Sequence, residues 1–338
     1  MDPNPPPTRR ALSRIFALAA FAAVVLLAAA TVRSAPEGTF ARLRDANPLL
    51  LAAGFTAYAI ALLFRGLRLT LLLPAESAIG TLRAWSLSAA SLLLVQVLPF
   101  RGGEVATWAA IRAELGAGWL RSGAVFFAAK LVDTAVLVLA GLAGFAAALA
   151  GGRSLGPGLA RDGAAAATAF AVTAVAAVAG AAILLLAPRL AGGSAARIAA
   201  RLPEGSRRGR FARELSGALG IARERPRRYL AAVGAAATFS ALQIAAASLM
   251  LLGLGIAVSP GGVAVALFSS ALVSSTVPSP VGNFGPTESG FAAGLALAGV
   301  PLPVGLVAAG ILHLLSTLSA GVAAIPFFVR HGTAALRR

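Results

Sequence analysis

Long uninterrupted runs of apolar residues, separated by short polar stretches, dominate this chain. Four of them cover residues 15–32, 122–150, 163–186 and 229–258, and each is close to the roughly 20 residues that a helix needs to cross a bilayer core. Inside lipid every backbone polar group has to be paired within the protein, which only helices and closed barrels achieve. The runs do not alternate between apolar and polar residues as barrel strands do, so the pattern predicts helices.

The complete hydrophobic pattern predicts eight main helices, with ends defined to within a few residues. We therefore expect an all-α fold, a polytopic integral membrane helix bundle with about eight spans that forms a single transmembrane domain over residues 1–338. The predicted helices cover residues 15–32, 48–64, 82–98, 122–150, 163–186, 229–258, 262–277 and 303–329.

The composition excludes a soluble fold and several kinds of chemistry. Apolar residues make up 58% of the chain and charged residues only 12%, about half the charged fraction of a soluble domain. There is no cysteine, which removes disulfides, thiol chemistry and Cys-ligated metals. The two histidines, His313 and His331, lie far in sequence from any acidic cluster. We therefore expect neither a metal site nor a cofactor.

The net charge of +17 comes almost wholly from arginine, because Lys130 is the single lysine. The arginines cluster beside apolar helices, so the charge indicates a membrane surface and not nucleic acid. Residues 189–228 hold eleven arginines against three glutamates. So short and basic a segment is typical of a cytoplasmic loop beside anionic lipid. We expect a multi-pass protein of a bacterial cytoplasmic (inner) membrane, with residues 211–215 in a helix at the interface.

The predicted helices and the basic segment disagree about orientation. Arg9, Arg10 and Arg14 favour a cytoplasmic N-terminus, yet five crossings before residues 189–228 would place that basic segment outside. The basic segment is the stronger signal. Either the N-terminus lies outside, or one of the five passes is miscounted.

Two segments interrupt the apolar pattern without resembling ordinary loops. These segments are residues 97–108 and 278–288. Each follows an aliphatic helix and contains Pro and Gly with a glutamate shortly after them. Apolar stretches too short to span comfortably, 105–115 and 289–300, come next. Unpaired backbone cannot face lipid, so the pattern predicts two re-entrant or broken helices that face a cavity.

Several polar residues in and near these segments are candidates for binding a lipid headgroup. Helix starts near Glu104 and Glu288 would attract an anion, although two turns with capping glutamates explain the pattern equally well. Arg101 lies within the first break, where its guanidinium could hold a phosphate bidentately. Asn283, within the second break, is a further candidate.

Charged residues inside apolar helices form a second group of candidates. Lys130 and Asp133 are three residues apart, which places them on one helix face, either as a structural pair or as a cavity lining. Arg65 and Arg68 lie at the end of a predicted helix, where anchoring at the membrane edge is the favoured interpretation and substrate contact the alternative. His313 and Gln243 are interpreted as hydrogen-bonded packing residues.

These residues resemble those of the lysylphosphatidylglycerol synthase transmembrane-region family, over about residues 48–329. That family includes the flippase domain of the multiple peptide resistance factor and hopanoid-biosynthesis-associated membrane proteins. The resemblance implies a membrane protein that handles lipids. The matching pieces are LFRGLRL at 63–69, LPFRGGE at 98–104, KLVD at 130–133 and PSPVGNFGPTE at 278–288.

Departures from the family pattern imply a different headgroup preference. The family carries Glu-Arg where this chain has Ala129 and Lys130, Arg where it has Thr287, and Tyr-Arg where it has Leu312 and His313. With Lys130 counted as a cation in place of one arginine, two arginines and one glutamate are missing from the presumed cavity.

The leading hypothesis is a lipid flippase or lipid-handling protein that moves a polar headgroup, phospholipid or other, through a central cavity. One alternative is a non-catalytic accessory subunit that works with a lipid-biosynthesis enzyme. The other is a membrane-embedded lipid transferase. No nucleophile with a neighbouring base and no nucleotide-binding motif is present, so no catalytic residues are assigned and a transporter is favoured over an enzyme.

Overall fold

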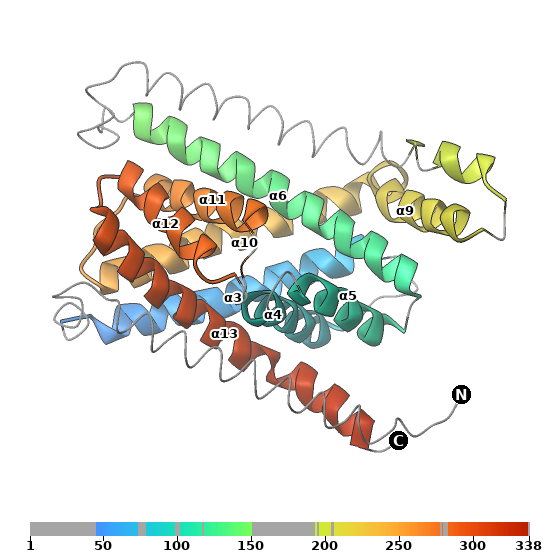
Figure 1. Cartoon of the computed structure of the whole chain (residues 1–338), viewed down its shortest axis with the longest axis horizontal. Coiled ribbons are helices and arrows are strands. Elements are labelled where there is room, and N and C mark those ends of the chain that lie inside the picture. The colour runs from blue at the N-terminus through green and yellow to red at the C-terminus, as the bar shows by residue number, and fades with distance from the viewer. Residues whose placement is uncertain are drawn as a thin grey trace.

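A computed structural model describes residues 45–73, 79–98, 102–116, 118–150, 193–194, 196–203, 206–277, 279 and 283–336. The helices predicted over 15–32 and 163–186 lie outside these residues, as does Arg101. The described part of the chain is helical throughout its regular structure, as expected (Figure 1). Its main helices are α3 (Pro48–Leu72), α4 (Thr81–Val97), α5 (Gly102–Leu115), α6 (Trp119–Ala150), α9 (Arg207–Glu224), α10 (Pro226–Gly253), α11 (Pro260–Thr276), α12 (Pro286–Leu297) and α13 (Leu302–Leu336).

Four of these helices are long and apolar enough to cross a membrane: α3, α6, α10 and α13. Large apolar side chains such as Leu230 and Leu318 remain exposed on them, as expected for surfaces that face lipid. α4 and α11 are also apolar but have only 17 residues each, or about 25 Å of helix against a hydrocarbon core of about 30 Å. Four of the predicted spans are therefore present as long helices, and two are shorter than a typical crossing.

α3 continues to Leu72, eight residues beyond its predicted end at Phe64. The segment after Phe64 consists mainly of leucine and arginine, both good helix formers, and contains no proline before residue 74. Arg65 and Arg68 therefore lie inside the helix, and the prediction that they stand at a helix end is wrong. Arg68 is only 4% exposed, so it does not anchor the protein at a membrane edge.

α3 and α10 form an antiparallel pair that is joined at both ends. The Asn47 amide donates to the Gly253 carbonyl at 2.8 Å, and the Arg228 guanidinium donates to the Thr70 carbonyl at 2.9 Å. Between these ends Gly54 faces the Ala246 backbone so closely that a Cβ would not fit. Small residues let membrane helices approach to this distance.

The two shorter helices each pair with the helix that follows, which gives two hairpins, α4–α5 and α11–α12 (Figure 1). Gly103 of α5 packs on the α4 backbone at Val95, and Gly294 of α12 packs on the α11 backbone at Ala266. A side chain at either glycine would collide with backbone atoms. The described parts of the interrupted segments thus lie where two tightly packed hairpins turn.

Each hairpin returns to the end of the bundle from which it starts. Figure 1 shows α3 ending and α6 beginning at one end, where α9 lies and α13 ends. We name this the basic end, because it carries most of the described arginines. α10 ends and α13 begins at the opposite end, where Gly144 of α6 meets Gly261 of α11. The α4–α5 hairpin therefore enters from the basic end, and the α11–α12 hairpin enters from the opposite end.

Candidate functional site

Five of the eight predicted headgroup-binding residues line one cavity of about 480 Å³, which we name the charged cavity. Its remaining walls are mostly apolar and include Phe126, Phe127, Phe268 and Leu272. The five predicted residues come from α3, α5, α6 and the segment just before α12, although they are up to about 220 positions apart in the sequence. The five predicted residues are Arg65, Glu104, Lys130, Asp133 and Asn283.

Asp133 of α6 forms ion pairs with two arginines of α3. Its carboxylate contacts the Arg68 guanidinium directly, and Arg65 Nε lies 3.9 Å from Asp133 Oδ2. The arginines are held further by backbone carbonyls, Arg65 by that of Ser88 at 3.1 Å and Arg68 by that of Ala129 at 3.3 Å. These contacts connect α3, α4 and α6 beside the cavity.

Lys130 pairs with Glu104 of the first hairpin, with 3.1 Å between Lys130 Nζ and Glu104 Oε1. The structure thus corrects the expected pairing of Lys130 with Asp133. Their spacing does place them on one face of α6, but α3 and α5 bring other charges closer to each. The Lys130 side chain is 51% exposed, so its ion pair is open to the cavity and a ligand could replace it.

The charge of this cluster favours an anion. Arg65, Arg68 and Lys130 face the two carboxylates of Glu104 and Asp133, which leaves one positive charge in excess when all five are ionised. Arg68 Nε is buried and has no hydrogen-bond partner among the described residues. An excess cation inside an apolar wall is costly unless an anion joins it.

Glu288 lies outside the lining of the charged cavity and has two protein partners. Its Oε2 accepts from the Gly285 amide at 2.6 Å and so caps the start of α12, while its Oε1 lies 2.5 Å from His313 Nδ1. Gly285 has φ +90, a conformation that L side chains rarely adopt. The capping role expected for Glu288 is present, and so is the hydrogen-bonded partner expected for His313.

A second cavity of about 250 Å³, which we name the neutral cavity, adjoins the first. Val95 from the first hairpin and Asn283 from the second line both cavities. The last turn of α4 and the residues just before α12 therefore both lie at the boundary between the two cavities. The polar residues of the neutral cavity are Tyr58, Gln96, Gln243, Ser270, Ser274, Asn283, Thr287, His313 and Ser316.

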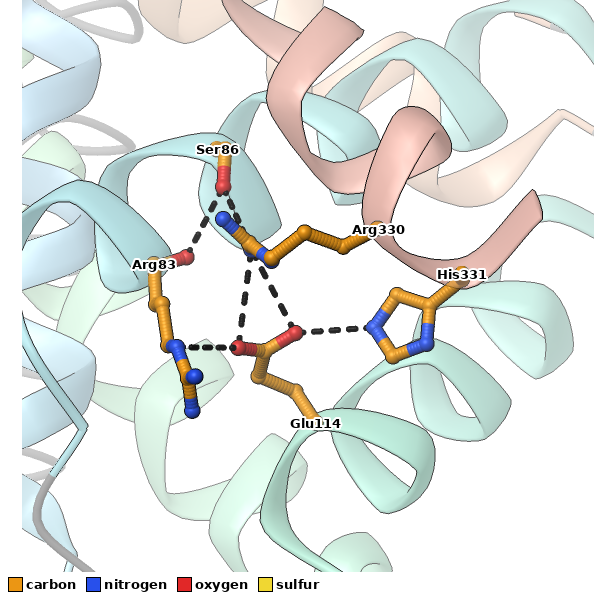
Figure 2. A network of polar contacts seen from close by, with 5 residues as sticks. All are labelled: Arg83, Ser86, Glu114, Arg330 and His331. Carbon is orange, nitrogen blue, oxygen red and sulfur yellow. Dashed lines mark hydrogen bonds and ion pairs between the residues drawn. The ribbon is translucent and has the colours of Figure 1, made fainter. Parts of the chain in front are cut away.

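A further ionic network, which no motif in the sequence indicates, is centred on Glu114 at the basic end (Figure 2). The Glu114 carboxylate is 3% exposed, and it lies 2.8 Å from His331 Nε2, 3.4 Å from an Arg330 nitrogen and 3.9 Å from Arg83 Nε. Arg330 also donates to Ser86 Oγ at 2.9 Å. The network joins α4, α5 and α13, and its α13 residues are more than 200 positions away from their partners in α4 and α5.

No group of three or more histidine, aspartate or glutamate side chains suited to a metal occurs within the described residues. The comparisons with known proteins give one match. The family model described as "Lysylphosphatidylglycerol synthase TM region" matches residues 14–324. Searches of curated proteins and of solved structures found no significant match. A match over so much of the chain, on a bundle with four long apolar helices, shows a multi-pass membrane protein that belongs to the lysylphosphatidylglycerol synthase transmembrane-region family.

Proposed function

We propose that this protein is a lipid translocase, in which the charged cavity holds a polar lipid headgroup while the acyl chains stay in the bilayer. The observation that supports this proposal best is the convergence of both hairpins on a cavity with charged and apolar walls. A headgroup that crosses a bilayer has to be kept out of hydrocarbon, and such a cavity supplies the polar surroundings.

The residues have distinct proposed roles toward an anionic headgroup. Arg65 and Lys130 contact the phosphate, since Arg65 lines the cavity and the Lys130–Glu104 pair is open to it. Glu104 and Asp133 hold these cations in place and set the charge of the cavity. Arg68, whose side chain is buried, holds Asp133 in position through their ion pair.

Three other predicted residues take supporting roles in this proposal. Asn283 offers hydrogen bonds from the second hairpin, because it lines both cavities. Glu288 shapes that hairpin by capping α12. Arg101 precedes α5 in the sequence and is proposed as a further phosphate ligand.

We also propose that both hairpins are re-entrant, which resolves the conflict over orientation. A hairpin that returns to its own side does not count as a crossing. The predicted span 15–32, α3, α6 and the predicted span 163–186 then give four crossings before the basic segment. The N-terminal arginines and residues 189–228 lie on the same side, and the positive charge makes that side the cytoplasm of a bacterial inner membrane.

Reconstitution into vesicles tests the proposed translocation. Phospholipids labelled on an acyl chain are placed in both leaflets, and a membrane-impermeant quencher reports movement between them. We expect Glu104→Gln and Lys130→Met to slow headgroup movement at least tenfold, because each leaves its partner unpaired in the cavity. Arg101→Ala should also slow it.

Matched changes outside the cavity provide the controls. Glu214→Gln and Arg210→Met remove the same kinds of charge from exposed positions on α9, and both should keep the wild-type rate. Wild-type vesicles that move no lipid above the protein-free rate would contradict the proposal. Copurification with a lipid-biosynthesis enzyme would then favour the accessory-subunit alternative.

A further inference from the structure

The neutral cavity differs in chemistry from the charged cavity beside it. Among the described residues that line it, polar groups are hydroxyls, amides and the His313 imidazole, and none is an aspartate, glutamate, lysine or arginine. Tyr58, Gln96 and Gln243 come from three different long or hairpin helices. A neutral polar lining of this kind favours an uncharged ligand part that exchanges hydrogen bonds.

His313 presents a hydrogen-bond acceptor to this cavity. Glu288 Oε1 lies 2.5 Å from His313 Nδ1. Because a carboxylate accepts, this contact places a proton on Nδ1, and in the tautomer whose single ring proton is there Nε2 keeps a lone pair. The ring is held in place by stacking on Phe284, with centroids 4.1 Å apart. The residue is 4% exposed, and Nε2 has no partner within the described part of the chain.

Gln96 presents a second acceptor. The Ser316 hydroxyl donates to the His313 carbonyl at 2.9 Å, so toward Gln96 it can only accept. Gln96 Nε2 lies 3.5 Å from Ser316 Oγ, which turns the amide oxygen Oε1 away from Ser316. That oxygen is buried and is likewise unpartnered among the described residues.

Two buried acceptors without donors are costly, because each has lost its water and gained nothing in exchange. A ligand that donates from two hydroxyl groups would satisfy both. An ammonium group fits less well, because no carboxylate lines the cavity among the described residues and both oxygens of Glu288, which contacts His313, are already engaged by Gly285 and His313. The cavity is therefore suited to a hydroxyl-bearing and uncharged group.

We propose that the neutral cavity is a subsite for an uncharged polyol or sugar that forms the outer part of the lipid headgroup. This inference rests on the proposed function, with the phosphate of the same lipid in the charged cavity. Val95 and Asn283 line both cavities, so one headgroup can reach across the boundary. His313 Nε2 and Gln96 Oε1 accept from its hydroxyls.

Equilibrium lipid binding to the full-length purified protein tests the subsite without requiring any transport. Two probes with the same acyl chains and the same single negative charge are offered in equal amounts, phosphatidylglycerol with two headgroup hydroxyls and phosphatidylpropanol with none. Native mass spectrometry measures the ratio of bound lipids. We expect phosphatidylglycerol to be preferred about tenfold or more, because the hydroxyl-free lipid leaves buried acceptors unpaired.

His313→Phe and Gln96→Leu should each bring the ratio of bound lipids toward one, with phosphatidylpropanol binding unchanged. His331→Phe, at the Glu114 network, is the matched control and should keep the preference. Gln96→Leu decides the question alone if His313→Phe does not fold. Equal binding of the two lipids to the wild type, or a preference that persists in the variants, overturns the subsite.

Failure of the proposed function has a different signature. A hydroxyl preference in binding, together with no lipid movement in vesicles, would overturn translocation and leave the subsite standing. Lipid movement in vesicles without any hydroxyl preference in binding would overturn the subsite and leave translocation standing.

Discussion

At the scale of single residues, the arrangement of charges around Asp133 differs most from what sequence spacing suggests. Three cations and two carboxylates lie close together. Asp133 forms ion pairs with two arginines of α3, and Lys130 forms an ion pair with Glu104. The Arg68 side chain is only 5% exposed. Its charge is tolerated there because Asp133 lies against it, so Asp133 matters for stability as well as for the proposed binding.

Replacing Asp133 by Asn should therefore lower the stability of the purified protein by about 3 kcal/mol, because it leaves the Arg68 guanidinium buried without a counter-charge. Thermal unfolding in detergent measures the change. Asp45→Asn, at an exposed position before α3, should leave the unfolding temperature unchanged. Combining Asp133→Leu with Arg68→Met should recover much of the loss, and a double variant as unstable as Asp133→Asn would contradict this explanation.

At the scale of helices, the two hairpins have the same design. In each, the returning helix carries a glutamate at its third position, Glu104 in α5 and Glu288 in α12. In each, glycines of the returning helix pack on the backbone of the helix before it. Close backbone contact lets a short helix remain in the bundle, where its length alone would not span the membrane.

Gly290 of α12 tests this packing, because a Cβ there would lie 2.6 Å from the Ser269 carbonyl oxygen of α11. We expect Gly290→Ala to separate the hairpin and to lower the unfolding temperature by several degrees. Gly234→Ala in α10 is the matched control, since nothing lies within 4 Å of a Cβ at that exposed position. There the substitution should be neutral or slightly stabilising. Equal effects at the two sites would argue against tight α11–α12 packing.

At the scale of the whole molecule, the hairpins enter from opposite ends of the bundle and meet in its interior. α4–α5 starts at the basic end beside the Glu114 network, and α11–α12 starts at the opposite end (Figures 1 and 2). Such opposed broken helices are typical of membrane proteins that bind a substrate near the bilayer midplane. The proposed orientation follows from this arrangement together with the distribution of arginine.

Single cysteines test the orientation directly, because the natural chain has none. Gly217→Cys lies in α9 at the basic end, and Ala257→Cys lies in the exposed connection between α10 and α11. In intact bacterial cells a membrane-impermeant thiol reagent should label Ala257→Cys and not Gly217→Cys. Both should react after the membrane is permeabilised. The opposite labelling pattern would invert the proposed orientation, and labelling of both in intact cells would contradict the single crossing by α10.

Much of the helical organisation could be predicted from the hydrophobic pattern, because in lipid a long apolar run has few alternatives to a helix. Four predicted spans are present as long helices, and both interrupted segments occur at hairpin tips. The sequence pattern places the end of α3 too early, because Arg65 and Arg68 are residues typical of a membrane edge. A charged residue does not have to end an apolar helix when an oppositely charged residue, such as Asp133, lies next to it on a neighbouring helix.

The amino-acid sequence by itself determined that this is a multi-pass helical membrane protein of a lipid-handling family, since apolar length and local motifs are properties of contiguous residues. Only the tertiary structure decided which charges pair and that Glu114 joins three helices. It also decided that His313 and Gln96 line one cavity, each with a buried side-chain atom that has no hydrogen-bond partner among the described residues. Those facts depend on helix packing between residues as far apart as Gln96 and Ser316. No pattern along the chain encodes such distances, because they arise when small residues let particular helix faces come together.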